Sequence, residues 1–332
     1  MKLASFHADE AARVGLAIDG VGVVELSAQV VGADPALWPD SVDALIAAGP
    51  QAWDLAREAA RRITADPAGA SVYALDAVSW RPPVARPSKI CCVAFNNSAN
   101  SDRIMRGPKH PALFLKPASA LVGHLGAIEC RAEYGRVHPE PELAVVIGKA
   151  ARNIRAEDAY DHVFGYTIHN DITSPTMREE DTFHYRAIHP KSGAKSGAKS
   201  GDTLEIEYVD SWVSYPGRYK GADTFACLGP WIVTKDEIAD PHALTVTCRH
   251  NGALVTEDNT ENFFFKLPEL LQFISRYMTL EPGDIVSMGT ALKPSARGGA
   301  VQNIDLNRLG GRISVTIDQI GELTNTVAHL HD

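Results

Sequence analysis

The pattern of apolar and polar positions divides the chain into two parts. Residues 2–26 contain three short stretches with the alternation of strands, and residues 41–63 carry apolar residues at helical spacing. This pattern predicts a small N-terminal α/β unit over residues 1–80. Three prolines lie between Ser79 and Lys89, where neither a helix nor a central strand can continue, so residues 81–89 are predicted to be a linker.

From Ile90 to the C-terminus the pattern is mostly that of strands separated by Gly, Pro and Asn turns. Only two segments have helical spacing, residues 156–162 and 267–278. The strands follow one another too closely for crossover helices, which favours an antiparallel or mixed sheet. We therefore expect an α+β protein that is mainly β, with the second domain over residues 90–332. The predicted strands are 90–95, 112–117, 142–148, 163–171, 203–209, 230–234, 244–252, 284–290 and 312–317.

Composition narrows the class of protein. Of the 332 residues, 45% are hydrophobic and 22% charged, as in ordinary globular domains. The net charge of −9 and the lack of a basic stripe argue against a nucleic-acid partner. No apolar run reaches the roughly 18 residues of a membrane span, and the first residues lack the apolar core of a secretion signal. We expect a cytoplasmic protein without a membrane partner, whose five cysteines are reduced.

Familiar short motifs are missing, and one segment is of low complexity. Gly20–Gly22 lacks the context of a dinucleotide-binding loop, and the chain has no P-loop, HExxH or GxSxG sequence. Lys191–Asp202 repeats a Lys-Ser-Gly-Ala unit nearly three times and cannot contribute to a core. A flexible surface loop is the simple interpretation, and a mobile lid over a nearby site is the alternative.

Two carboxylates precede a buried-looking strand in "VHPEPELAVVIGK". Glu140 and Glu142 are two residues apart and project to the same face of a strand. Their repulsion and lost hydration would be offset by a divalent cation, and oxygen ligands favour Mg²⁺, Mn²⁺ or Ca²⁺. The alternative is a solvent-exposed pair on an edge strand. Asp171, at the end of "GYTIHND", is a further acidic residue after an apolar run, although Asp at such a position is often a turn former.

Four segments in order, "EPELAVVIGK", "GYTIHND", "KGADTF…GPWIV" and "TLEPGDIVSMGT", resemble the fumarylacetoacetate hydrolase family, and specifically its bacterial members that act on 2-oxo acids. The resemblance spans about residues 89–327. It implies a mixed β-roll domain after a small N-terminal domain, usually as a homodimer. It also implies a small-molecule 2-oxo-acid substrate and a metal, most often Mg²⁺, held by Glu140, Glu142 and Asp171. By the same resemblance, Lys220 lies beside the metal and Thr290 meets the substrate carboxylate.

The chain departs from the family pattern where hydrolytic members carry a water-activating His and Glu. Asn96 matches the motif, but Asn100 and Arg103 occupy the positions of that pair, and neither is a general base near neutral pH. We consider Asn100 and Arg103 as substrate-binding residues instead. After Asp171, Pro175 stands where the family has an arginine. Arg178 could clamp a distal substrate carboxylate, or it could be a surface residue among acidic neighbours.

The proton-transferring residue is therefore open. His138 lies two residues before Glu140 and is the best placed by spacing, although it could equally support a glutamate. The other histidines in the region that builds the site are His124, His169, His184 and His189.

Two enzymatic functions are close to parity. One is a metal-dependent hydrolase that cleaves a C–C bond in an acylpyruvate or fumarylpyruvate-like 2,4-dioxo acid through a metal-stabilised enolate. The other is a lyase or isomerase on a 2-oxo acid, such as a decarboxylase, dehydratase or tautomerase, for which the missing His/Glu pair is dispensable. A non-catalytic 2-oxo-acid binder is a third hypothesis.

Overall fold

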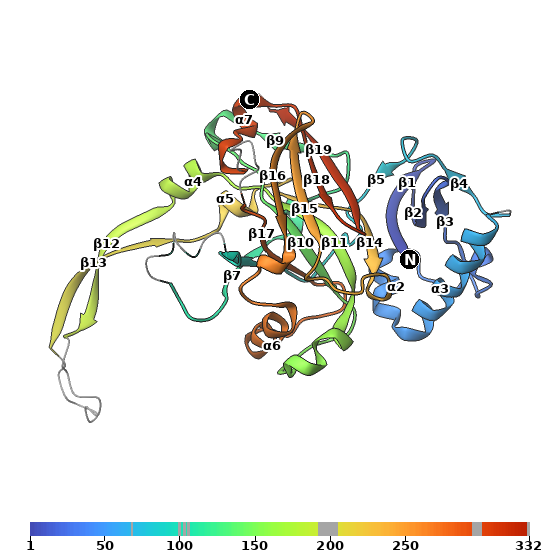
Figure 1. Ribbon diagram of the computed structural model, residues 1–332, viewed down its shortest axis with the longest axis horizontal. Helices are drawn as coiled ribbons and strands as arrows, with labels where there is room; N and C mark the ends of the chain where they lie inside the picture. Colours follow the sequence, from blue (N-terminus) through green and yellow to red (C-terminus); the bar gives the residue numbers. More distant parts are fainter. Residues whose placement is uncertain are drawn as a thin grey trace.

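The computed structural model of the protein (Figure 1) describes residues 1–67, 69–98, 101, 104, 107–191, 205–293 and 301–330. Strands dominate, and they form a twelve-stranded sheet, a five-stranded sheet and a two-stranded arm. The expected α+β class, mainly β, is confirmed. No helix in these ranges combines the length and the apolar character needed to cross a membrane.

The twelve-stranded sheet runs through the whole molecule. Its strands follow the order β4-β3-β2-β1-β14-β11-β10-β17-β6-β7, with β5 beside β1 and β8 beside β14. Most neighbours are antiparallel, but β17–β6 and β14–β8 are parallel, so the sheet is mixed. The strands are β1 Lys2–Ala8, β2 Ala11–Ile18, β3 Gly22–Glu25, β4 Val72–Tyr73, β5 Ser79–Trp80, β6 Ile90–Ala94, β7 Ala112–Lys116, β8 Leu121–Val122, β10 Pro141–Ile147, β11 Val163–Asp171, β14 Ala226–Thr234 and β17 Ile285–Thr290.

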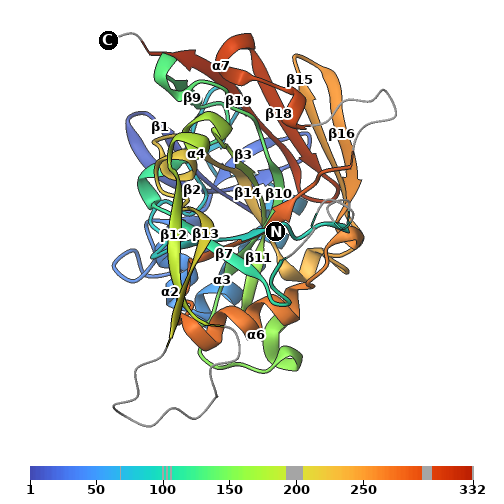
Figure 2. The same cartoon turned by 90° about the vertical axis from the view of Figure 1, so that its left-hand side faces the viewer.

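The five-stranded sheet packs against one face of this sheet (Figure 2). Its order is β16-β15-β18-β19-β9, and the strands are β9 Ala127–Cys130, β15 Thr245–His250, β16 Ala253–Asn259, β18 Arg312–Ile317 and β19 Gly321–His329. The sequence pattern extended the strand from 244 to 252, but β15 ends at His250, and Asn251 and Gly252 form the turn that joins it to β16. Both residues have positive φ, 49° and 82°, as a tight hairpin turn requires.

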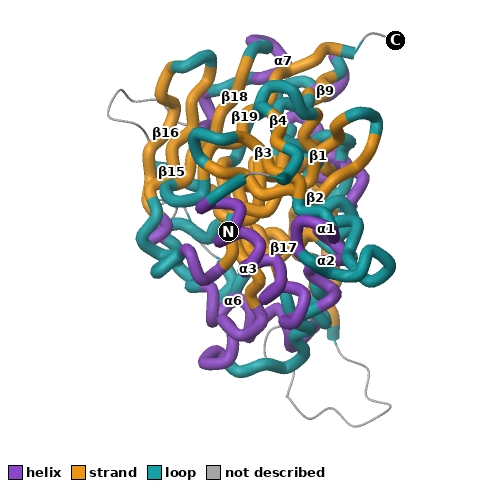
Figure 3. Tube along the Cα trace, turned by 90° about the vertical axis from the view of Figure 1, so that its right-hand side faces the viewer, coloured by secondary structure: helices purple, strands orange, loops and turns teal. Residues whose placement is uncertain are grey.

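Helices cover the other face of the large sheet at its N-terminal end (Figure 3). They are α1 Ala28–Val31, α2 Val42–Ala48 and α3 Pro50–Ala65. In β10 the two apolar faces go to different cores. Leu143, Val145 and Ile147 pack toward the five-stranded sheet, whereas Ala144 and Val146 pack on the helical side. Burial on both faces confirms that β10 is a central strand, not an exposed edge.

The remaining elements connect the sheets or extend from them. The predicted helix at 267–278 is α6 Leu267–Tyr277, and the segment Ala156–His162 forms a 3₁₀ helix. Short helices α4 Pro175–Glu180, α5 Arg218–Gly221 and α7 Leu306–Leu309 lie between strands. Strands β12 Thr182–Pro190 and β13 Ile206–Ser214 form an arm that projects away from the rest of the molecule (Figure 1).

The N-terminal part is joined to the larger part by main-chain pairing. Strand β1 pairs with β14, with Lys2 opposite Val233 and Leu3 opposite Ile232. The sheet thus continues from the first strands into those that carry the acidic residues. The boundaries at residues 80 and 90 stay a prediction, as does the role of the repeat, since residues 192–202 lie outside the described ranges.

Candidate active site

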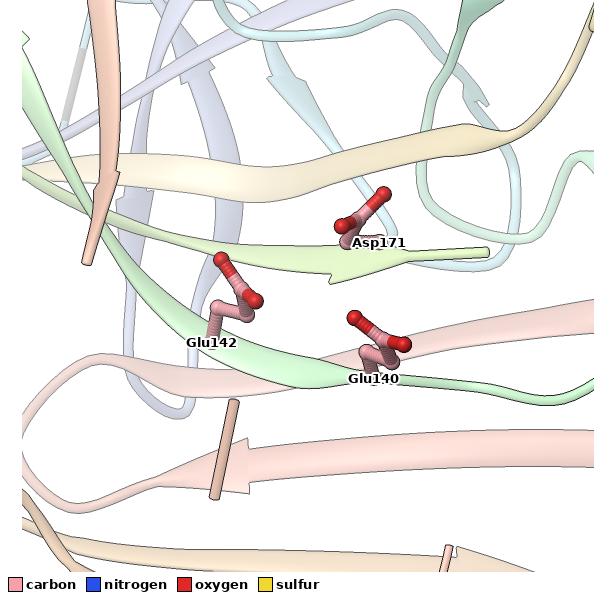
Figure 4. Close-up of side chains that lie close together, drawn as sticks. All are labelled: Glu140, Glu142 and Asp171. Atoms are coloured by element: carbon pink, nitrogen blue, oxygen red, sulfur yellow. The ribbon is translucent and has the colours of Figure 1, made fainter. Parts of the chain in front are cut away.

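Two neighbouring strands, β10 and β11, bring the three predicted acidic residues together. Glu140 immediately precedes β10, Glu142 lies within it, and Asp171 ends β11. The antiparallel register places Pro141 opposite Asn170, and the Asp171 N–H donates to the Glu140 carbonyl at 2.8 Å. One oxygen from each of the three carboxylates lies within 4.8 Å of the other two (Figure 4). Local strand pairing therefore brings together two parts of the chain about 30 residues apart.

Two lysines oppose these carboxylates. Lys220, from α5, donates to Glu140 Oε2 at 2.8 Å and to Asp171 Oδ2 at 2.5 Å. Lys116, the last residue of β7, forms a buried ion pair with the other oxygen of Asp171. Three carboxylates and two ammonium groups leave the cluster with one net negative charge. Because the cluster is net negative, it attracts a divalent cation. The charge of this donor set therefore fits a bound cation.

Burial and the opposite charges act against each other on the pKa values. For Asp171, burial alone would raise the pKa, but Lys116 and Lys220 hold it below its usual value. For Lys220, burial alone would lower the pKa, but Asp171 and Glu140 hold it above its usual value. Both groups are therefore charged at neutral pH, and Asp171 can offer an ionised oxygen to a cation.

Strand β17 holds the Glu142 carboxylate through hydrogen bonds. Ser287 donates to Glu142 Oε2, and His169 Nδ1 lies 2.7 Å from the serine oxygen. Because the serine hydroxyl donates to the carboxylate, it accepts from His169, whose Nδ1 therefore carries the proton. Gly289 N–H also points to Glu142, at 3.3 Å. His169 therefore contacts Ser287, which holds Glu142, and does not line the pocket.

Thr290 closes the cluster at the end of β17. Its hydroxyl lies 3.1 Å from Glu140 Oε2 and 3.0 Å from Glu142 Oε1. The Thr290 carbonyl accepts from Asn97, which also donates to the buried Asp258 at the end of β16. The threonine is therefore held by both sheets. Its predicted contact with a substrate carboxylate stays a prediction.

A pocket of about 370 Å³ opens over the carboxylates. Phe114 forms part of its wall, with Lys220 Nζ 4.9 Å from the ring centroid. Of the described residues that line it, His138 is the one histidine, and its Nε2 lies 3.8 Å from Glu140 Oε1. His138 Nδ1 lies 3.2 Å from the Pro139 carbonyl, so Nδ1 carries the proton of the neutral ring and Nε2 is free to accept one.

The environment of His138 favours that neutral ring. Burial lowers the pKa of His138, and the neighbouring Glu140 carboxylate only partly offsets the effect. The residue precedes β10 and pairs with Thr173 in an isolated bridge, so it does not extend the glutamate strand as its spacing suggested. It is nevertheless at the pocket.

The other predicted residues have different outcomes. Arg178 is exposed on α4 and lies at the rim of the pocket. Asn100 and Arg103 lie outside the described residues. His184 is on the arm, stacked against Trp212, and His124 packs against Trp80 at a distance from the carboxylates.

Lys116 and Ser287 were not predicted. The available signal for Lys116 was a lysine that ends an apolar strand, which is unusual unless the ammonium has a buried partner. Its partner, Asp171, is 55 residues away, and only the folded sheet brings the two together.

The chain is similar to known proteins over nearly its whole length. It is 31% identical to the mitochondrial oxaloacetate tautomerase fahd2 of Xenopus laevis over 331 residues, which cover 98% of this chain and 90% of that protein. It is 34% identical to the oxaloacetate tautomerase YisK of Bacillus subtilis over 267 residues, 79% of this chain and 77% of that protein.

The chain is also similar to solved structures over nearly its whole length. The maleylpyruvate hydrolase from Sphingobium sp. SYK-6, in complex with manganese(II) and pyruvate, matches over 100% of both chains with a TM-score of 0.68 and 30% identity. A fumarylacetoacetate hydrolase from Exiguobacterium antarcticum matches over 99% of this chain and 100% of its own, with a TM-score of 0.74 and 28% identity. Residues 89–328 match the fumarylacetoacetate (FAA) hydrolase C-terminal family, so the chain belongs to this family of enzymes.

Proposed function

We propose that the protein is a divalent-metal-dependent tautomerase that interconverts the keto and enol forms of a small 2-oxo dicarboxylic acid, such as oxaloacetate. The observation that carries this proposal is the cluster of Glu140, Glu142 and Asp171, faced by two lysines, of which Glu140, Glu142 and Lys220 line one pocket. The names of relatives that share 31–34% identity support the choice of reaction. So does the replacement of the hydrolytic His/Glu pair by Asn100 and Arg103.

Mg²⁺ is the cation that we propose for Glu140, Glu142 and Asp171, with Mn²⁺ or Ca²⁺ as substitutes. The all-oxygen donor set supports a hard cation, and the Sphingobium structure contains manganese(II). When bound, the cation supplies a Lewis acid that stabilises negative charge on the oxo oxygen.

The residues of the chain supply the remaining chemistry. Lys220 keeps a second positive charge beside the same oxygen, since its ammonium is fixed between Glu140 and Asp171. We assign the proton transfer to His138 Nε2, which takes a proton from the carbon next to the oxo group and delivers it to the enolate oxygen to give the enol, and the reverse transfer regenerates the keto form. We assign the 1-carboxylate to the Thr290 hydroxyl and the distal carboxylate to Arg178, and both residues line the pocket.

Hydrolysis of an acylpyruvate is the second candidate. The match to a maleylpyruvate hydrolase over the whole of both chains supports it. This reaction needs a base that activates water, and His138 is the described pocket residue that we would assign to it. The two candidates share the same enolate chemistry and differ in whether a C–C bond breaks.

The experiment that tests both uses the purified protein with enol-oxaloacetate, an acylpyruvate and maleylpyruvate, in Mg²⁺ and in EDTA. We expect Mg²⁺-dependent loss of enol absorbance faster than the spontaneous rate. Glu142→Gln should lower the rate at least about 100-fold, since it removes one anionic ligand. Glu157→Gln, on the exposed side of the 3₁₀ helix, is the matched control and should leave the rate unchanged.

Other products, or activity without metal, would point to a different function or overturn the metal assignment. Pyruvate and a free acid, without faster tautomerisation, would establish the hydrolase instead, and CO₂ release would establish a decarboxylase. If activity survived EDTA and Glu142→Gln, the metal assignment itself would be wrong.

A further inference from the structure

Phe95 has an unusual backbone conformation at the mouth of the pocket. Its φ is 56°, in the left-handed region, which an L residue with a large side chain rarely adopts. Among the described non-glycine residues with positive φ, Phe95 is the only aromatic one and the only one that lines the pocket over the carboxylates. Such a conformation persists only where the surrounding structure imposes it, and these positions are concentrated at functional sites.

The two residues that follow impose this conformation. Asn96 donates to the Met288 carbonyl at 2.8 Å and to the Phe265 carbonyl at 3.0 Å, and its side-chain oxygen accepts the Phe265 N–H at 2.8 Å. Asn97 donates to Asp258 Oδ2 at 2.9 Å, and both asparagines are buried. Strand β6 ends directly before the strained residue, and these hydrogen bonds fix the chain directly after it.

The fixed backbone leaves the Phe95 side chain in solvent at the pocket mouth. Exposure increases along this segment, from the buried Val93 and the half-buried Ala94 to Phe95, which is 63% exposed. A phenylalanine with this exposure contributes little to the core, and a glycine would adopt the same φ without a steric cost. The presence of the ring therefore needs an explanation outside the core, and the pocket that it lines supplies one.

The pocket combines a charged region with a mainly apolar one. Glu140, Glu142 and Lys220 mark the region in which we place the 2-oxo acid group. Much of the remaining lining is apolar and comprises Val93, Phe95, Leu113, Phe114, Pro216 and Leu292. The volume of about 370 Å³ lies in the range of pockets that enclose drug-sized ligands, so a four-carbon acid such as oxaloacetate leaves part of the pocket unfilled.

We propose that Phe95 is a specificity-determining residue, whose ring packs against the part of a bound 2-oxo acid that extends beyond the reacting carbons. The ring favours acids with an apolar tail over acids without one. Because the turn holds Phe95 at the mouth in the free protein, little backbone freedom is lost when a ligand binds. This inference rests on the proposed function for the identity of the ligand's polar end.

The role of Phe95 is compatible with the one that we propose for Arg178. Both residues are exposed and line the same pocket. A guanidinium selects a carboxylate at the far end of a ligand, whereas an aromatic ring selects the carbon chain that precedes it. The two side chains therefore act on different parts of one ligand, and their effects can be measured separately.

Titration calorimetry in the presence of Mg²⁺ tests the proposal without any turnover. The probes are pyruvate, which has no tail, and 2-oxooctanoate, which has an apolar one, and the wild type should bind 2-oxooctanoate more tightly. Phe95→Gly should lower the ratio of the two affinities at least about 10-fold, since one apolar group in a hydrophobic pocket changes discrimination by about that factor or more. Phe95→Leu keeps an apolar side chain and should retain most of the ratio.

Leu125→Gly is the matched control. Leu125 also has positive φ, 62°, and is 46% exposed, but it does not line the pocket, so its replacement should leave the affinity ratio unchanged. Urea unfolding then separates a ligand contact from a structural role. Phe95→Gly relieves the left-handed backbone, so its urea midpoint should equal or exceed that of the wild type. A structural role of the ring would instead lower the midpoint.

The same titrations separate this inference from the proposed function. If the wild type binds both acids but does not prefer 2-oxooctanoate, or if Phe95→Gly keeps the wild-type ratio, the role of Phe95 is overturned and the proposed function stands. A ratio that falls equally in Leu125→Gly, or a lower urea midpoint of Phe95→Gly, would also overturn it. If the wild type binds neither acid with Mg²⁺ present, the proposed function fails and this inference fails with it.

Discussion

At the scale of single residues, the site is a balance of buried charges. Lys116 is 2% exposed and Asp171 is fully buried, and their side chains form an ion pair that is shielded from solvent. Removing one partner of such a pair leaves an uncompensated buried charge, which costs far more than losing an exposed pair. The ammonium that the sequence did not reveal is therefore as important to this cluster as the carboxylates that it did reveal.

Lys116→Met should destabilise the protein by about 3 kcal/mol or more in EDTA, as measured by urea unfolding. The cluster then carries two net negative charges, so Mg²⁺ should restore part of the lost stability and raise the unfolding midpoint more than it does in the wild type. Lys2→Met is the control, because Lys2 pairs with the exposed Asp19 and should cost less than about 1 kcal/mol. Equal losses in the two variants would contradict the role of Lys116.

At the scale of elements, Gly289 near the end of β17 allows this strand to pack closely against Asn96 and to hydrogen-bond Glu142. Gly289 has φ of 108°, and a Cβ there would lie 2.8 Å from the Asn96 Cβ. Its N–H also donates to Glu142. Only glycine meets both demands, which explains why it precedes Thr290.

Gly289→Ala should therefore destabilise the protein by about 2–3 kcal/mol and weaken Mg²⁺ binding, because the displaced strand end no longer holds Glu142. Gly20→Ala separates the steric effect from the backbone effect. Gly20 also has positive φ, 76°, but no atom lies within 4 Å of the added Cβ, so a cost of about 1 kcal/mol is expected. Urea unfolding and calorimetric Mg²⁺ titration of both variants would check this, and an equal effect on the two would refute it.

Sequence periodicity predicted the strands that carry the site but not the pairings between them. Apolar runs located β10 and β11, and the acidic residues lie at the start of β10 and at the end of β11. Periodicity did not reveal β12, whose "TFHYRAIHP" mixes aromatic, polar and charged residues without a buried face. Nor could it place Lys116 beside Asp171, since that contact depends on the order β11-β10-β17-β6-β7 across the sheet. Local pattern defines elements, whereas long-range register defines the site.

At the scale of the whole molecule, the N-terminal part is held by pairing with strand β14, over 200 residues away, and by packing at His124. The His124 ring meets Trp80 of β5 edge-on, with ring centroids 5.5 Å apart. His124 Nδ1 accepts the Thr324 N–H of β19 at 3.0 Å. The His124 side chain therefore contacts both β5 of the twelve-stranded sheet and β19 of the five-stranded sheet.

This arrangement makes stability depend on pH. Burial lowers the pKa of His124 to about 4 from a usual 6.5, with Glu322 opposing the shift and Arg312 adding to it. Between these values the unfolded chain binds the proton more readily than the folded one. The stabilising contribution is therefore complete above pH 6.5 and is lost as the pH falls toward 4.

His124→Gln should flatten that part of the pH profile, because an amide oxygen can still accept the Thr324 N–H but does not titrate. We expect the urea midpoint of the wild type to fall more steeply than that of the variant between pH 6.5 and 4, with similar slopes above pH 7. Replacing the exposed His184 with Gln, on the arm, controls for the loss of a histidine as such and should leave the profile of the wild type in place. Parallel profiles for wild type and His124→Gln would show that this imidazole is not protonated on unfolding in that range, and that the junction is held by packing alone.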